Sequence, residues 1–140
     1  MFNFTRKMLA HQFHLTSKDV NYLTKKRQYF SKGNFSFFYI LQYSNRPFNQ
    51  LSFHVTIKVS KCAVWRNFIR RVIMKYLQES HFTETKIHHT YYKLFLNLNK
   101  NMLTELQHFI QQKDKTKIKE YLIKNFQTSF TSFQQFLWKK

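Results

Sequence analysis

The chain has 140 residues, a length that fits one domain with short extensions. Its 43% apolar content is enough for a compact core and excludes wholesale disorder. The 24 Lys and Arg residues against 6 Asp and Glu give a formal net charge of +18, which predicts a polyanionic partner.

Membrane and secretion signals are missing from the sequence. No run reaches the roughly 18 apolar residues needed to cross a bilayer, and the N-terminus lacks the apolar core of a secretory signal. The single cysteine, Cys62, excludes an internal disulfide and fits a reducing compartment, so we expect the cytoplasm. Arg6 and Lys7, in an acid-free N-terminus, leave organelle targeting as the alternative.

The aromatic content is unusually high, with 17 Phe, 8 Tyr and 2 Trp. A core of this size needs fewer rings, so some of them would face a ligand. Codon usage in an AT-rich genome is the alternative explanation, and composition leaves both open.

The N-terminal part predicts an extension followed by a short helix. Residues 1–14 form the extension. Cap residues from Thr16 to Asp19 precede Val20 and Leu23, which repeat at helical spacing. We therefore expect a helix over 17–25.

Two strands follow. Residues 35–43 are dense in aromatic and β-branched side chains, and residues 51–58 alternate apolar and polar positions. The turn at 44–47 lies between them, so we expect the two strands to pair as a hairpin.

Residues 63–79 predict the clearest helix in the chain. At about 100° per residue, an apolar arc faces the sheet and a polar arc faces outward. The apolar arc consists of Trp65, Ile69, Val72, Ile73 and Tyr76, and the polar arc of Arg66, Asn67, Arg70, Arg71 and Lys75.

The C-terminal part predicts a third strand over 91–98, after a loop at 80–90, and then two helices broken near Lys113 and Asp114. Residues 127–140 form a tail. The order αββαβα predicts an α+β sandwich with helices on a small sheet, and one domain over 15–126.

The residues that catalysis would need are sparse. Residues 20–78 contain no acid, which argues against a two-metal carboxylate site. His11 and His14, like His88 and His89, lack the carboxylates or thiolates of a zinc site. One glycine cannot make a glycine-rich phosphate loop, so we expect neither catalysis nor metal binding by the chain itself.

The outward arc of helix 63–79 forms a cationic ridge, defined by Arg66, Arg70 and Arg71. Its one-turn spacing of about 5.4 Å is close to that of successive RNA phosphates, and a guanidinium binds phosphate bidentately. Arginines that only shield the core with their stems are the alternative. That alternative fails because no nearby acid compensates the charge.

These residues resemble a known family. The stretch from Lys58 through Arg66, Asn67 and Arg70 to Arg71 is similar to the signature of the ribonuclease P protein subunit. The likeness covers about residues 15–99. In two departures, Phe68 and Met74 stand where the family has Arg, and the turn before the helix is about one residue shorter.

The resemblance implies a fold and a function. The fold would be ribonuclease P protein-like, with a small mixed sheet and a left-handed βαβ crossover. In the family a large RNA cleaves the 5′ leader from precursor tRNA, using magnesium held mainly by that RNA, with no organic cofactor. The implied partners are this catalytic RNA and precursor tRNA, in the bacterial cytoplasm, with no membrane and no obligate protein partner.

The resemblance also implies roles for individual residues. Val20 and Phe38 would line the cleft for the single-stranded leader, although Phe38 belongs to the core if its strand faces the other way. The catalytic RNA would be bound by Lys58, Lys61, Arg66, Asn67, Arg70 and Arg71.

Three other functions compete with this one. A structural protein of the ribosome would share the charge and the RNA target without a role in cleavage. A membrane-active cationic protein would insert the apolar arc of helix 63–79 into the lipid, but that arc is needed to cover the sheet. A free-standing nuclease would need the carboxylates that the sequence lacks.

Overall fold

The computed structural model describes residues 13–26, 28–32, 34–87 and 89–139. Their elements confirm the predicted helices, the third strand and the break between the last two helices. In chain order these elements are α1 (Ser17–Lys26), β1 (Tyr29–Lys32), β2 (Phe35–Leu41), β3 (Gln50–His54), α2 (Ala63–Glu79), η3 (Phe82–Glu84), β4 (Tyr92–Leu98), η4 (Lys100–Met102), α3 (Leu103–Gln111) and α4 (Lys115–Trp138).

Within the described residues the four strands form one sheet in the order β1-β2-β4-β3. β2 runs antiparallel to β1 and β4, while β3 runs parallel to β4. The predicted hairpin between the strands at 35–43 and 51–58 is therefore wrong, because β4 lies between the corresponding strands β2 and β3. β4 takes the centre because its residues 92–94 and 96 are all buried, as suits a strand with a neighbour on each side.

β1 was not predicted from the sequence. It has only four residues, from Tyr29 to Lys32, and pairs with the start of β2, with Tyr29 opposite Phe38. A short edge strand carries too little alternation to be recognised, and its register comes from β2. The β-hairpin of this protein is thus β1–β2.

α2 connects the parallel neighbours β3 and β4, so the βαβ unit implied by the resemblance is present. The bounds predicted for α2 are confirmed. Ile69 and Ile73 are fully buried, and Trp65, Val72 and Tyr76 pack at the edge of the core.

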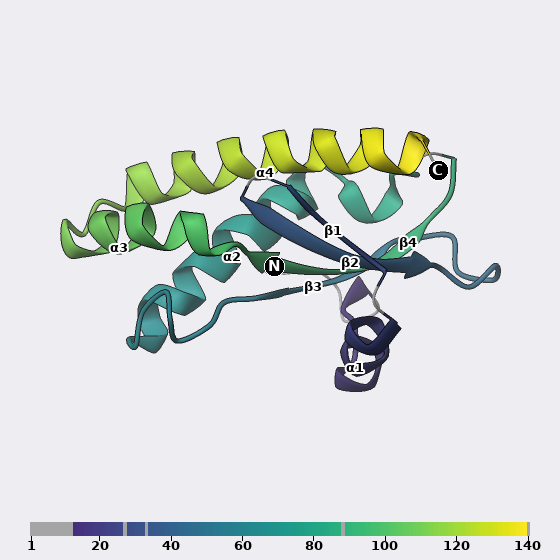
Figure 1. Cartoon of the computed structure of the whole chain (residues 1–140), viewed down its shortest axis with the longest axis horizontal. Helices are drawn as coiled ribbons and strands as arrows, with labels where there is room; N and C mark the ends of the chain where they lie inside the picture. Colours follow the sequence, from purple (N-terminus) through teal and green to yellow (C-terminus); the bar gives the residue numbers. More distant parts are fainter. Residues whose placement is uncertain (1–12, 27, 33, 88, 140) are drawn as a thin grey trace, which may run out of the picture.

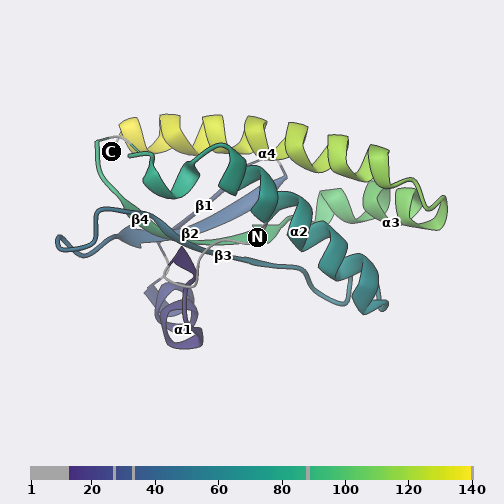
Figure 2. The ribbon, with the colours of Figure 1, turned by 180° about the vertical axis from the view of Figure 1, so that it is seen from behind.

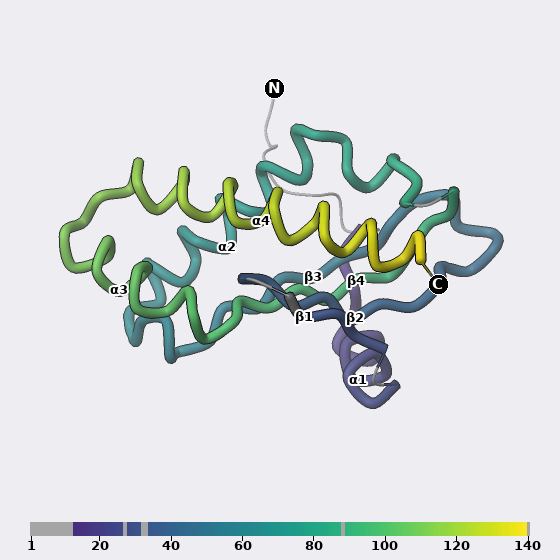
Figure 3. Tube along the Cα trace, turned by 45° about the horizontal axis from the view of Figure 1, so that its top comes forward, coloured from purple at the N-terminus to yellow at the C-terminus, as the bar shows by residue number. Residues whose placement is uncertain are grey.

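The sheet has two different faces, which Figures 1 and 2 show from opposite sides. Of the helices in the described residues, α2 and α4 cover one face, while α1 lies against the other; Figure 3 shows the same separation along the Cα trace. Phe35, Phe37 and Tyr39 of β2 point toward α4, where the Phe37 and Phe133 rings stack with centroids 4.6 Å apart.

The prediction of a tail at 127–140 is wrong. α4 continues to Trp138, and its Phe133 and Leu137 are buried in the core. The buried rings of α4 were hard to recognise from the sequence because Thr, Ser and Gln residues separate them. The sheet supplies the missing half of that core.

Candidate nucleic-acid interface

A row of aromatic side chains crosses the face of the sheet on which α1 lies. Since Phe37 and Tyr39 point toward α4, strand alternation turns Phe38 to the α1 face, where it is half-buried rather than in the core. The ring of Phe38 stacks on Tyr29 at 5.3 Å and lies 6.0 Å from Phe95. His54 continues the row, 6.4 Å beyond Phe95. We call these four residues the aromatic row.

α1 and the same face enclose a groove. Its middle part has a volume of about 350 Å³ and is lined by Val20 and Asn21 of α1, by Ser52 and His54 of β3, and by Phe95. Thus Val20 lies in a hollow beside one end of the aromatic row.

Two further hollows extend this groove in both directions along β3. Gln50, Arg46 and the paired Lys93 and Asp19 border one, which leaves the charge of Arg46 uncompensated there, and Lys58 and Lys100 border the other. The outward side chains of β3 line the three hollows in sequence order, so we treat them together as the α1 groove. Its two ends are cationic and its middle is aromatic, which suits a single nucleic-acid strand.

A capping box orders the start of α1, and an ion pair links the helix to the sheet at this groove. Thr16 and Asp19 form a capping box: the Asp19 N–H donates to Thr16 Oγ1 at 3.1 Å, and the Thr16 N–H donates to Asp19 Oδ2 at 3.2 Å. The ammonium of Lys93, almost fully buried, lies 3.0 Å from Asp19 Oδ1 and 4.1 Å from the centre of the Tyr43 ring. Burial alone would raise the pKa of the Asp19 carboxyl, but hydrogen bonds from Lys93 and Thr16 outweigh burial and hold the pKa below its ordinary value.

The cationic ridge lies along α2, on the part of the helix that the core leaves open. Arg71 and Asn67 are exposed, and Arg66 and Arg70 are half-buried. Arg66 Nη1 donates to the Ser60 carbonyl at 2.9 Å, and Arg70 Nη1 donates to Asn67 Oδ1 at 2.7 Å. A guanidinium has five N–H donors, so these bonds leave most of them for another partner.

No carboxylate compensates the ridge within the described part of the chain, where Lys93–Asp19 is the only salt bridge. This confirms that the ridge neither points into the interior nor is masked by acids. The positive charge of the ridge is therefore available to attract a polyanion.

The loop before α2 connects the ridge with the groove. Lys58 and Lys61 are both exposed in it. Lys58 borders one end of the α1 groove, and its carbonyl accepts a hydrogen bond from Gln107 Nε2 at 2.8 Å. Lys61 lies beside the first turn of α2. The structure therefore separates the predicted residues into two groups, with Lys58 between them.

Sequence reasoning missed several residues of the interface. Tyr29 went unnoticed because β1 was not predicted. Phe95 was inside a predicted strand, and its alternation with the buried Leu94 and Leu96 would have placed it on the opposite face. Arg46 and Lys100 carry no local signal, since only the sheet brings them to the ends of the groove.

The described residues contain no group of three or more His, Cys, Asp or Glu side chains arranged to hold a metal ion. His11 and His88, one from each of the histidine pairs noted above, lie outside the described residues. None of the helices described here combines the length and apolar character of a membrane span.

Comparisons with known proteins agree with this geometry. The family model for ribonuclease P matches residues 10–122. The structure of the Staphylococcus aureus RNase P protein has a similar fold, with a TM-score of 0.58 and 14% sequence identity, over 84% of this chain and 94% of that one. No curated protein sequence matches the chain. Because the family match spans most of the sequence, the chain belongs to the ribonuclease P family.

Proposed function

We propose that this ribonuclease P protein subunit binds two RNAs through two surfaces. The cationic ridge, with Asn67, Lys58 and Lys61, holds the catalytic RNA. The α1 groove, with Val20 and Phe38, holds the single-stranded 5′ leader of precursor tRNA. The observation that carries this proposal is the aromatic row on the α1 face of the sheet, whose Phe95 and His54 line the middle of the α1 groove, separate from the uncompensated ridge.

The chemistry of the ridge suits a phosphate backbone. Arginine forks bind phosphate oxygens in pairs, and each neutralised phosphate releases counterions. Asn67 adds a neutral donor and acceptor for a ribose hydroxyl or a base edge. Binding here would be tight at low salt and weak at high salt.

The chemistry of the groove suits a single strand of any sequence. Bases stack on aromatic faces without their edges being read, and each stacked base contributes about 1–3 kcal/mol. Tyr29, with 54% of its surface exposed, offers an open ring face at one end of the aromatic row. Leaders differ in sequence, so stacking is the appropriate mode of recognition.

The chain would take no part in the bond cleavage itself. Residues 20–78, which include β2, β3 and most of α2, contain no carboxylate, and Asp19, which lines the groove, is paired with Lys93. We therefore assign the catalytic magnesium mainly to the RNA partner, which would supply the metal-activated attack on the phosphodiester. We also assign the protein to the bacterial cytoplasm, in keeping with its single exposed thiol, Cys62.

A structural protein of the ribosome remains the second candidate function. It would require the ridge but not an aromatic groove beside α1. A membrane-active role finds no support, because the apolar arc of α2 packs in the core.

Reconstitution tests the proposal. The purified protein should lower the magnesium concentration that the ribonuclease P RNA of the same organism needs to cleave precursor tRNA. The stimulation should disappear when the leader is shortened to one nucleotide, because the groove then has no ligand. Cleavage that the protein does not stimulate, or that ignores leader length, would favour the structural role.

A further inference from the structure

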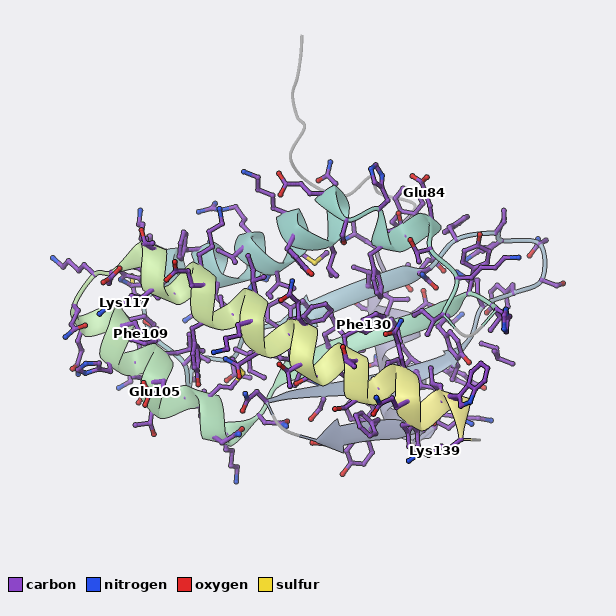
Figure 4. All side chains as sticks on the ribbon, turned by 90° about the horizontal axis from the view of Figure 1, so that it is seen from above. Glu84, Glu105, Phe109, Lys117, Phe130 and Lys139 are labelled. Carbon is purple, nitrogen blue, oxygen red and sulfur yellow. The ribbon has the colours of Figure 1, made fainter. Side chains whose placement is uncertain are left out.

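A second groove lies between α2 and α4, on the far side of the sheet from the α1 groove. Figure 4 shows α4 crossing the molecule with α2 along one flank. Phe68, Val72 and Tyr76 of α2 and Ile123 of α4 form its apolar lining. The volume of about 270 Å³ lies just below the range of roughly 300–1,000 Å³ typical of drug-sized ligands. We call it the α2–α4 groove.

The rim of this groove is cationic. Arg71 and Lys75 of α2 and Lys119 of α4 border it, and Lys115 Nζ lies 5.5 Å from the centre of the Phe68 ring. Glu79 is the one acidic side chain in the lining. It forms no salt bridge with these cations in the described part of the chain.

We propose that the α2–α4 groove binds one unpaired base of the catalytic RNA, stacked against Phe68, with the flanking phosphates on Arg71, Lys75 and Lys119. The inference rests on the proposed function, since Arg71 belongs both to the ridge and to this rim. A phosphate bound at Arg71 brings its nucleotide to the edge of the apolar lining.

The combination of ring and cations favours RNA over an acidic peptide. The carboxylates of an acidic peptide would satisfy the rim, but they would leave the small apolar space unfilled. A nucleotide supplies both parts, because its phosphate is anionic and its base has two aromatic faces. The base must be unpaired, since a base inside a helix is already stacked on both faces.

Variants of the groove test this inference through their affinity for the ribonuclease P RNA of the same organism. Phe68→Leu keeps an apolar side chain but removes the ring face, and should weaken binding by roughly fivefold or more, the lower end of base–aromatic stacking. Lys119→Gln should lower the salt slope of binding by about one unit. Val64→Ala, at an exposed apolar position of α2 outside the groove, should change neither quantity.

Crosslinking locates the ligand directly. A photoreactive aromatic amino acid in place of Ile123 should crosslink to one nucleotide of the catalytic RNA. The same probe in place of Gln134, exposed on a later turn of α4, should not. Removing the base from the crosslinked nucleotide should abolish the difference in affinity between the wild-type protein and Phe68→Leu.

Failure of this inference is distinct from failure of the proposed function. If the wild-type protein stimulates cleavage while Phe68→Leu and Lys119→Gln bind RNA like wild type, the α2–α4 groove does not hold a base. Crosslinks from position 123 to a second copy of the chain or to another protein would equally overturn the inference. A protein that never binds or stimulates the RNA would contradict the proposed function itself.

Discussion

At the residue scale, the proposed function assigns separable contributions to charge and ring face. An arginine on the ridge would contribute to RNA binding through phosphate neutralisation, which salt weakens. A ring in the aromatic row would contribute through stacking, which depends little on salt. The two kinds of variant should therefore differ in the salt dependence that they produce.

Removing two ridge charges should flatten the salt dependence of binding to the catalytic RNA. We choose Arg70→Gln with Arg71→Gln, because Arg66 also bonds the Ser60 carbonyl and its loss would disturb the loop. The slope of log K against log salt should fall by about two units, measured by filter binding across a salt series. Lys86→Gln with Lys139→Gln removes the same charge elsewhere and should leave the slope unchanged. An unaltered slope in the ridge variant would mean that the ridge does not contact RNA.

Removing a ring face should weaken leader binding alone. Tyr29→Ala or Phe38→Leu should reduce the affinity of the assembled enzyme for precursor tRNA by about 1–3 kcal/mol, without altering the salt slope. Affinity for mature tRNA, which has no leader, provides the control and should stay constant. Equal losses for both RNAs would place the row outside the leader site.

Phe68 and Met74, which stand where the family has Arg, have different structural settings. Met74 is buried, so an arginine there would have to leave the core. Phe68 lines the α2–α4 groove and makes an edge contact with Trp65 at 6.1 Å. The Met74 departure follows from packing, and the Phe68 departure underlies the base-binding inference.

At the scale of elements, one ion pair and one buried leucine hold α1 against the sheet. Asp19 links the first turn of α1 to Lys93 in the middle of the sheet, and Leu23 packs beneath the helix. The wall of the α1 groove is thus tied to its floor by a contact across 74 residues of sequence. Breaking this contact should affect both stability and leader binding.

Asp19→Asn should destabilise the protein by about 1–3 kcal/mol, because it leaves the Lys93 ammonium buried without its charged partner. Urea unfolding monitored by circular dichroism measures the change. Lys93→Met in the Asp19→Asn background should restore part of the loss, since it removes the unpaired charge. If the double variant lost as much unfolding free energy as the sum of the two single variants, the two residues would not be coupled.

The same ion pair predicts a pH dependence with a definite sign. The pKa of Asp19 is lower in the folded protein than in the unfolded chain, so its stabilising effect is complete above the unfolded pKa. The effect is lost as the pH falls through the folded pKa, so the loss of stability is confined to the acidic range. Unfolding free energies from pH 7 downward should decline less steeply in Asp19→Asn than in wild type; parallel curves would contradict this assignment.

At the scale of the whole molecule, the helical layer of α2 and α4 covers one face of the sheet and leaves the other face to α1 and the proposed leader site. α4 spans the sheet from the α3 junction to the C-terminal end, as Figures 1 and 4 show. Its last turns supply Phe133, whose ring packs with Phe37 and Tyr39. The segment 127–138 therefore belongs to the fold.

Phe133→Ala should cost about 3–5 kcal/mol of unfolding free energy, as truncation of a large buried ring does. The neighbouring Gln134→Ala, at an exposed position, should change stability by less than about 0.5 kcal/mol. Denaturant melts of the two variants compare them directly. If both variants melt like wild type, α4 does not hold the core together.

The sequence alone determined what periodicity and charge can determine. The bounds of α2, the buried Ile69 and Ile73 and the acid-free ridge follow from residues close together in the chain, because a helix repeats every 3.6 residues, whereas the burial of Met74 and Leu77 was not predicted. The Arg66–Asn67 and Arg70–Arg71 pairs also lie within one short stretch of sequence, and the sequence alone therefore indicated the resemblance to the family.

Only the tertiary structure decided which strands are neighbours and which rings share a face. β4 enters between β2 and β3 because its buried residues need a partner on each side, and local sequence does not encode that insertion. Tyr29, Phe38, Phe95 and His54 come from four strands spread over 67 residues, and strand pairing alone aligns them. Long-range pairing likewise places the end of α4 in the core, because its rings are buried only once the sheet has formed.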